Sequence, residues 1–248
     1  MVSRPITQFF PLLNREGCNI LNERENVHSR TLVDRVAVDI EDIRQGVRFK
    51  GNASREGLKV GHLNIRRLKE EKIKGITARM REWGLDIFIL LDTGVTKEES
   101  VFIRKSMNEA LVKEYGGEGG RVLDSPLGEV MEHRVGGQIV LISPRLAGTH
   151  VDFVKCRTGL GILMEMWIRG PGTSLALFST YWPSTGRGPG GLHERLKEWM
   201  EKRKNRRDPM EEIREVVGGR VLAAQQRGAG TVLLGDLNMT WGKLREWA

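Results

Sequence analysis

The C-terminal part of the sequence carries two polar side chains directly after an apolar segment. In the stretch GTVLLGDLNMTW, Asp236 and Asn238 follow the apolar run TVLLG. A short apolar run bounded by glycines is consistent with a buried β-strand. Loops at strand ends often carry the residues that bind and react. A carboxylate and an amide at this position could take part in phosphodiester cleavage, and turn formation is the alternative for either residue alone.

Three other apolar runs also end in a polar side chain. Asn64 follows VGHL, Asp92 follows DIFILL and Tyr181 follows LALFST. One such residue would be explained by turn formation or by a place on the rim of the domain. Four apolar runs that all end in this way favour a shared functional site at one end of a sheet.

The elements that must position these residues alternate between strand and helix character. Strands are predicted at 58–65, 86–91, 136–143, 161–168, 174–182 and 231–236, from alternating or continuous apolar runs. Apolar residues at helical spacing predict helices over 69–84, 97–113 and 191–207. A further helix around 213–221 is expected to be interrupted or weakened by Gly218 and Gly219.

Five segments in order resemble the motifs of the endonuclease/exonuclease/phosphatase superfamily, the DNase I-like proteins. The segments are HLNIRRL, DIFILLDTG, GGQIVLIS, STYWPS and GDLNMT, spread over residues 58–242. The resemblance implies an α/β (α+β) fold: a four-layer sandwich of two mostly antiparallel sheets flanked by helices. It also divides the chain into a polar, largely disordered tail over 1–56 and the N-terminal portion of the superfamily domain over 57–248.

The same resemblance assigns roles to the polar residues. Asn64 and Asp92 are expected to hold a metal ion, Mg²⁺ or alternatively Mn²⁺, because hard divalent cations prefer oxygen ligands. Tyr181, Asp236 and Asn238 are expected to be catalytic. Tyr181 would donate a hydrogen bond to a phosphate oxygen. Asp236 would orient or deprotonate the attacking water or assist the leaving group, with Asn238 fixing the geometry.

The sequence departs from the superfamily pattern at three points. Asp92 stands in place of a longer glutamate, and Arg66 occupies a position where several of these nucleases carry an acid. The expected terminal Asp-His pair is not found before residue 248. We therefore expect a C-terminally truncated domain with impaired activity. The degenerate motifs are closest to retroelement-type endonucleases, which accompany reverse transcriptases.

Charge favours a polyanionic partner. The chain has 40 Lys and Arg against 32 Asp and Glu, a net charge of +8 and a pI of about 9.7. Basic side chains bind phosphates and release condensed counterions, so nucleic acid, and DNA in particular, is the expected partner. The alternatives are a non-catalytic nucleic-acid-binding remnant and a phosphatase acting on inositol phosphates.

Segments for membrane insertion or secretion are not recognised in the sequence. No apolar run reaches the roughly 20 residues of a membrane span, and the N-terminus lacks a secretion signal. Two cysteines are too few for a disulfide framework. The expected location is intracellular, in the nucleus or the cytoplasm.

The N-terminal tip, SRPITQFFP, carries three apolar residues in an otherwise polar segment. Ile6, Phe9 and Phe10 have the spacing of one face of a helical turn. The stretch resembles the peptide that docks repair proteins on the sliding clamp, except that Ser3 replaces the usual glutamine. Packing onto the chain's own domain is the favoured interpretation, and a sliding-clamp contact is the alternative.

Overall fold

The central strands of the molecule are apolar on both faces. In β4 (Ile87–Leu91), Ile87, Ile89 and Leu91 enter one hydrophobic core, whereas Phe88 and Leu90 enter another. Successive strand residues point to opposite faces, so a strand of this kind needs a covering layer on each side. The fold supplies one layer with helices and the other with a second sheet.

The computed structural model describes residues 8–11, 36–38, 58–128, 134–147, 150–155, 159–170, 173–183 and 191–238. Within them, the first sheet has the strand order β2-β3-β4-β6-β5 and the second has the order β1-β10-β9-β8-β7. The remaining strands of the first sheet are β2 (Val36–Val38), β3 (Leu58–Asn64), β5 (Arg121–Ser125) and β6 (Gln138–Ile142). Those of the second sheet are β1 (Gln8–Pro11), β7 (His150–Lys155), β8 (Leu163–Gly170), β9 (Thr173–Tyr181) and β10 (Gly230–Asp236).

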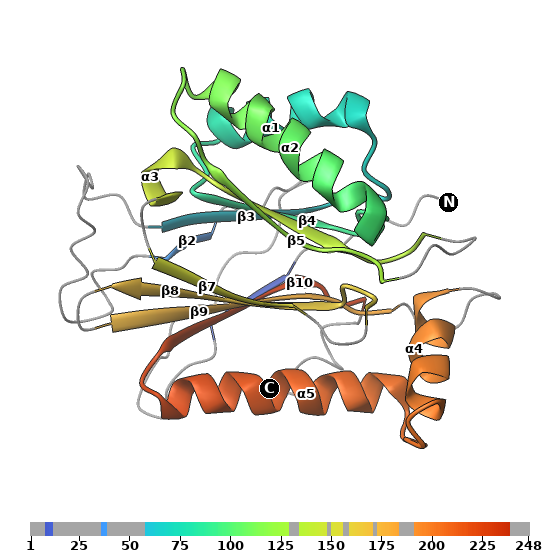
Figure 1. Cartoon of the computed structure of the whole chain (residues 1–248). Coiled ribbons are helices and arrows are strands. Elements are labelled where there is room, and N and C mark those ends of the chain that lie inside the picture. Colours follow the sequence, from blue (N-terminus) through green and yellow to red (C-terminus); the bar gives the residue numbers. More distant parts are fainter. Residues whose placement is uncertain are drawn as a thin grey trace, which may run out of the picture.

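Two strand pairs are parallel, β3 with β4 and β9 with β10, and the other pairs are antiparallel. The two sheets pack face to face, with helices on both outer faces (Figure 1). On the first sheet lie α1 (Glu70–Glu82) and α2 (Lys97–Glu114), and on the second lie α4 (Leu192–Glu201) and α5 (Pro209–Gln226). A short α3 (Pro144–Ala147) follows β6. The four-layer α/β sandwich of mostly antiparallel sheets is confirmed.

Three hydrophobic cores lie between these four layers. One joins the first sheet to α1 and α2, one fills the space between the sheets, and one joins the second sheet to α4 and α5. The strands that alternate between two cores are therefore fixed from both sides. None of the helices in the described part of the chain combines the length and apolar character that crossing a bilayer requires.

The expected interruption of the last helix at Gly218 and Gly219 is wrong, because α5 runs without a break through both glycines. The reason is tertiary packing. Ile213, Val217 and Val221 recur every four residues and are buried against the second sheet. Burial of such a stripe outweighs the roughly 1 kcal/mol that each glycine costs in helix propensity.

The helical turn expected at the N-terminal tip is also wrong for the residues that the structure describes. Phe9 and Phe10 belong to β1, whose backbone pairs antiparallel with Leu234 and Leu233 of β10. An unpaired edge of β10 would leave backbone hydrogen-bonding groups without partners, which favours adding a strand there. The pairing agrees with the favoured interpretation that this stretch packs on its own domain. Ile6 and most of the 1–56 tail lie outside the described residues.

Gly235 of β10 lies directly beside Thr180 of β9 and has no room for a side chain. Its φ is +145°, and a Cβ there would lie 1.8 Å from the carbonyl oxygen of Thr180. We expect Gly235→Ala to destabilise the fold by about 3 kcal/mol or more in urea unfolding. A Cβ at Gly218 would meet nothing within 4 Å.

Gly218→Ala is therefore the matched control, expected to stabilise the chain by up to about 1 kcal/mol. Equal midpoints of urea unfolding for Gly235→Ala and Gly218→Ala would contradict the close approach of β9 and β10 at Gly235.

Candidate functional site

Three of the predicted site residues lie on the strand faces that line the space between the sheets. On β3, Leu58 and Val60 point into the inter-sheet core, and the two-residue period continues to Asn64. On β10 the same period leads from Leu234 to Asp236, and on β9 it leads to Tyr181. All three residues end their strands at the same end of the molecule, so they close the inter-sheet core there.

Asp92 reaches the same place through a change in backbone conformation. It follows Leu91, whose side chain is already in the inter-sheet core, so simple alternation would send the next side chain to the other face. Asp92 instead has φ of +55°, in the left-handed region. Its Oδ1 accepts a hydrogen bond of 2.7 Å from the backbone N–H of Gly136. Such a conformation is uncommon in residues other than glycine and occurs more often at functional sites.

Hydrogen bonds join these residues across the two sheets. Asn64 Nδ2 donates to Asp236 Oδ2 at 3.0 Å, which connects β3 of the first sheet to β10 of the second. The Tyr181 hydroxyl forms hydrogen bonds with the side chains of Asn64 and Asp92. The structure therefore brings together both predicted metal ligands and two of the three predicted catalytic residues.

Asn238, the fifth predicted residue, supports this cluster from the loop after β10. Its backbone N–H donates to Asp236 Oδ1 at 3.2 Å, and its Nδ2 donates to the carbonyl oxygen of Trp182 at 2.6 Å. Asn238 has φ of +45°, a conformation that asparagine adopts more readily than most residues. In this structure Asn238 orients Asp236 and fixes the loop against the end of β9.

The environment shifts the protonation equilibria of all three acidic groups. Burial raises the pKa of Asp92, and the nearby charge of Asp236 raises it further, whereas hydrogen bonds from Gly136 and Tyr181 lower it. Burial also raises the pKa of Asp236 against the opposing effect of the Asn64 hydrogen bond. Burial and the charges of both carboxylates raise the pKa of Tyr181 above its usual value. The phenol therefore stays protonated and remains a hydrogen-bond donor at neutral and alkaline pH.

Arg66 contributes a positive charge beside the two carboxylates. Arg66 and Arg67 both have positive φ, of 45° and 75°, and form a turn whose backbone donates to Asn64 Oδ1 and to the carbonyl oxygen of Asp92. The charge of Arg66 lowers the pKa of Asp92 and of Asp236. Within the described part of the chain, the exposed guanidinium forms no ion pair shorter than 4 Å.

Sequence patterns did not identify the buried polar residues beneath the site. Ser179 Oγ donates to Gln138 Oε1 at 2.6 Å, joining β9 to β6 across the inter-sheet core. His62 precedes Asn64 on the same face of β3, and burial lowers its pKa to about 4, which keeps the imidazole neutral near pH 7. Ser179 and His62 lie two residues before Tyr181 and Asn64, so strand alternation places them on the same faces as the site residues. A single polar residue within a strand is nevertheless weak evidence of a functional role.

The donor set suits a hard divalent cation such as Mg²⁺. Asp92 and Asp236 supply carboxylate oxygens from different sheets and repel each other electrostatically, and a bound cation would relieve that repulsion. Asn64, which is hydrogen-bonded to Asp236, supplies an amide. Among the residues that the structure describes, no group of three or more His, Cys, Asp or Glu side chains is arranged to hold a metal. A site built from these residues would leave several cation positions to water or substrate oxygens, as is usual for Mg²⁺.

The raised pKa of Asp92 makes the stability of the fold depend on pH. An acid whose folded pKa exceeds its unfolded value stabilises the fold below the unfolded pKa and loses that contribution as pH rises through the folded pKa. Asp92→Asn removes the buried charge and keeps an oxygen for the Gly136 N–H and a residue type that tolerates positive φ. We expect it to raise the melting temperature by a few degrees at pH near 7, about 1 kcal/mol.

The advantage of Asp92→Asn should disappear below the ordinary carboxyl pKa of 3.8. Asp152→Asn is the matched control, because this carboxylate is only partly buried and pairs with Arg169, and the substitution should change stability by less than about 0.5 kcal/mol. A lower melting temperature for Asp92→Asn at neutral pH would show that the ionised carboxylate stabilises the fold.

Comparisons with known proteins give matches among solved structures alone: no family model matches the chain, and no curated protein shows a significant match. The chain is similar to the AP endonuclease LMAP from Leishmania major, with 17% identity and a TM-score of 0.49 over 73% of this chain. It spans 55% of that enzyme's chain. A humanized TDP2 from D. rerio matches with 11% identity and a TM-score of 0.44, over 76% of this chain and 69% of that one. ANGEL2, a 2′,3′-cyclic phosphatase, matches with 13% identity and a TM-score of 0.38, over 74% of this chain and 54% of that one. All three belong to the endonuclease/exonuclease/phosphatase superfamily, which is also the superfamily that the five sequence motifs resemble.

Proposed function

We propose that this chain is a phosphodiester hydrolase of nucleic acid, with DNA as its substrate and Mg²⁺ as its cation. The observation that carries the proposal is the meeting of Asp92 and Asp236 from two different sheets, joined through Asn64 and Tyr181. Two partly buried carboxylates with raised pKa values are costly for the fold, so their convergence favours a functional role.

Each residue can serve one part of such a reaction. Asp92, with Asn64 beside it, would hold the cation, which supplies charge stabilisation at the phosphate when bound. Asp236 is held at a strand end by Asn64 and Asn238, and its raised pKa makes it a stronger base toward an attacking water. Tyr181 remains protonated and can donate a hydrogen bond to a non-bridging phosphate oxygen as negative charge builds there.

The positive charge of the chain supports nucleic acid as the substrate class. A net charge of +8 attracts any polyanion, and each phosphate neutralised releases counterions. An origin in a retroelement-type endonuclease domain is part of the proposal and rests on the degenerate motifs alone. Hydrolysis of inositol phosphates is the alternative within the same chemistry, distinguished by activity on those compounds and none on DNA.

A second candidate function, nucleic-acid binding without cleavage, is favoured by Arg66. Its positive charge acts on both carboxylates and so offsets part of the negative charge that would attract a cation. The guanidinium could hold a phosphate at the same site, since arginine suits planar recognition of phosphate oxygens. This reading predicts salt-sensitive DNA binding and no Mg²⁺-dependent nicking.

The direct test is nicking of supercoiled plasmid by the purified chain with Mg²⁺ and with EDTA. We expect Mg²⁺-dependent nicking that Asp236→Asn lowers by about 10²-fold or more, the usual contribution of a general base. Tyr181→Phe should lower it by about 10²-fold, as expected for loss of one donor to a developing oxyanion.

Asp152→Asn, which removes a surface carboxylate outside the cluster, should nick at the wild-type rate. Nicking that survives Asp236→Asn would assign the cleavage to another site or to a contaminant. Binding without nicking by the wild-type chain would establish the second candidate.

A further inference from the structure

The turn between α4 and α5 carries an unusual concentration of positive charge. Lys197–Asp208 contains six basic and three acidic residues, a net charge of +3. We define the basic corner as residues 202–207, which have the sequence KRKNRR. Its exposed cations Lys202, Lys204 and Arg206 form no side-chain ion pair or hydrogen bond with the described residues. Unpaired charges grouped in this way are available to a partner of opposite charge.

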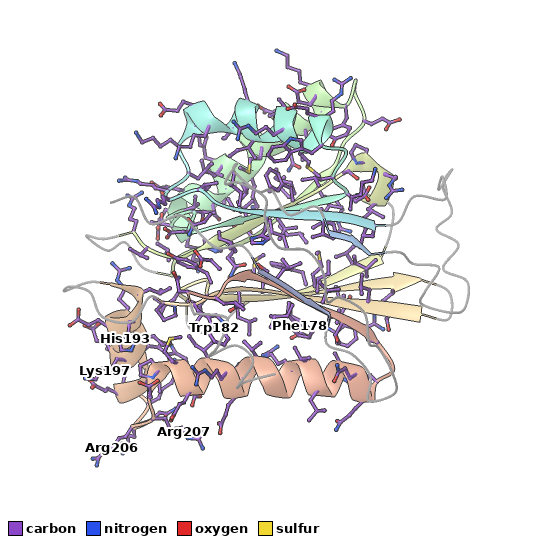
Figure 2. The ribbon with its side chains drawn as sticks, turned by 180° about the vertical axis from the view of Figure 1, so that it is seen from behind. Phe178, Trp182, His193, Lys197, Arg206 and Arg207 are labelled. Atoms are coloured by element: carbon purple, nitrogen blue, oxygen red, sulfur yellow. The ribbon has the colours of Figure 1, made fainter. Side chains whose placement is uncertain are left out.

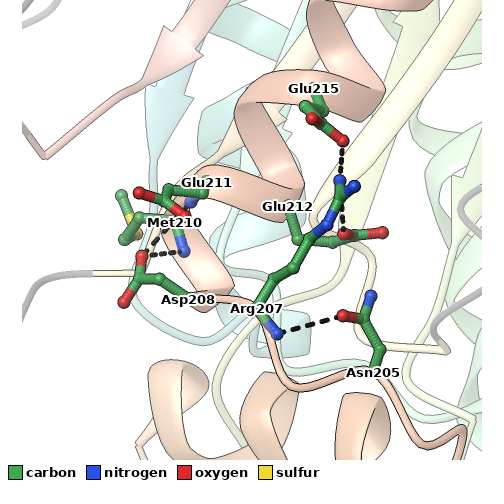
Figure 3. A network of polar contacts seen from close by, with 7 residues as sticks. All are labelled: Asn205, Arg207, Asp208, Met210, Glu211, Glu212 and Glu215. Atoms are coloured by element: carbon green, nitrogen blue, oxygen red, sulfur yellow. Dashed lines mark hydrogen bonds and ion pairs between the residues drawn. The ribbon is translucent and has the colours of Figure 1, made fainter.

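The basic corner has a defined conformation rather than the freedom of a solvated helix end. Arg203 stacks over the ring of Trp199 at 3.9 Å, and the backbone N–H of Asn205 donates to Met200 at 3.0 Å. Figure 3 shows how Arg207 closes the turn: its N–H donates to Asn205 Oδ1 at 3.1 Å, and its guanidinium pairs with acids of α5. A pre-ordered turn loses little entropy when it binds.

The start of α5 holds the other side of the corner. Asp208 caps the helix by accepting from the N–H groups of Met210 and Glu211, at 2.8 and 3.2 Å, and Pro209 occupies the first helical position (Figure 3). Both features favour a sharp helix start at this residue. The three unpaired cations are therefore held between two helix ends.

Packing connects the basic corner to the candidate site through Trp182. The carbonyl oxygen of Trp182 accepts a hydrogen bond from Asn238 Nδ2. The backbone N–H of Trp182 donates to the carbonyl oxygen of Asp236 at 2.8 Å. Its indole is fully buried in the core that includes Leu192 and Leu196 of α4. Figure 2 shows Trp182 toward the same end of the molecule as the basic residues of α4 and the corner. The core around Trp182 thus packs the site and α4 against each other.

We propose that the basic corner binds the phosphate backbone of the nucleic acid strand that flanks the scissile phosphate. The proposal rests on the proposed function, because it extends that substrate beyond the site. The basic corner lies at the C-terminal end of α4, whose ten residues span about 15 Å at 1.5 Å per residue. A strand that advances about 3.4 Å per nucleotide would need four to five nucleotides to cover this length.

The composition of the corner favours phosphate over a protein partner. The exposed large apolar residues in the described part of the chain are Val101, Phe102, Val112, Val216 and Leu222, none of which lies in the corner. Protein interfaces usually depend on buried aromatic or apolar anchors, whereas binding to a phosphate backbone is driven by charge.

The test compares two triple variants that remove the same charge. Lys202→Gln, Lys204→Gln and Arg206→Gln are combined in the corner variant. Lys74→Gln, Lys105→Gln and Lys113→Gln are combined in the control, whose lysines are exposed on α1 and α2, across both sheets from α5 (Figure 1). Affinity for labelled DNA strands of about 4 and about 12 nucleotides is measured over a range of salt, with thermal melting to confirm folding.

We expect the corner variant to bind the longer strand about 10-fold or more weakly at low salt, with a salt-dependence slope reduced by about two to three. Its affinity for the shorter strand should match the wild type, and the control should keep the wild-type slope. An unchanged slope in the corner variant, or equal losses in both variants, would overturn the proposal. Competition by poly-glutamate as strong as that by unlabelled DNA would also overturn the proposal, because it would identify the corner as a general polyanion surface.

The outcomes separate this proposal from the proposed function. Corner-dependent binding without Mg²⁺-dependent nicking supports the corner as a nucleic-acid surface and rejects catalysis. If the corner variant nicks and binds DNA as the wild type does, the role of the basic corner is rejected and the proposed function stands.

Discussion

The contact between Asn64 and Asp236 is the point on which the candidate site depends. It joins the last residue of β3 in the first sheet to the last residue of β10 in the second. The two sheets must therefore be packed in a fixed register, because a one-residue slip would turn either side chain to the opposite face. The inter-sheet core and the buried Ser179–Gln138 hydrogen bond fix that register next to the site. The site is thus a consequence of how the two sheets pack.

The same packing has an energetic cost at the site. The core that fixes the strands also desolvates the two carboxylates and the phenol, and raises the pKa of each. Asp92 and Asn238 additionally hold backbone conformations with positive φ. A fold that keeps buried charges and uncommon backbone conformations together has the features expected of a binding or catalytic site. The rest of the domain offsets the cost through three apolar cores.

Much of this arrangement follows from the sequence, because the relevant signals are local. Apolar runs located β3, β4, β6, β8, β9 and β10, and the polar residues after four of them are those that meet in the structure. β5 and β7 were not predicted, since RVLDS and HVDFVK are short and mixed in polarity, and strand pairing rather than local pattern defines them. The left-handed turn at Asp92 and the position of Arg66 depend on contacts with distant segments. Such contacts between distant segments cannot be predicted from local sequence patterns.

We propose that Asp92 and Asp236 face one shared position where a divalent cation and a phosphate meet. The most direct measurement is anomalous diffraction from crystals of this chain soaked with Mn²⁺, which can replace Mg²⁺ and scatters anomalously. We expect a single strong peak about 2 Å from a carboxylate oxygen of Asp92, on the side that faces Asp236. A peak elsewhere on the chain, or carboxylates that point into separate regions, would contradict it.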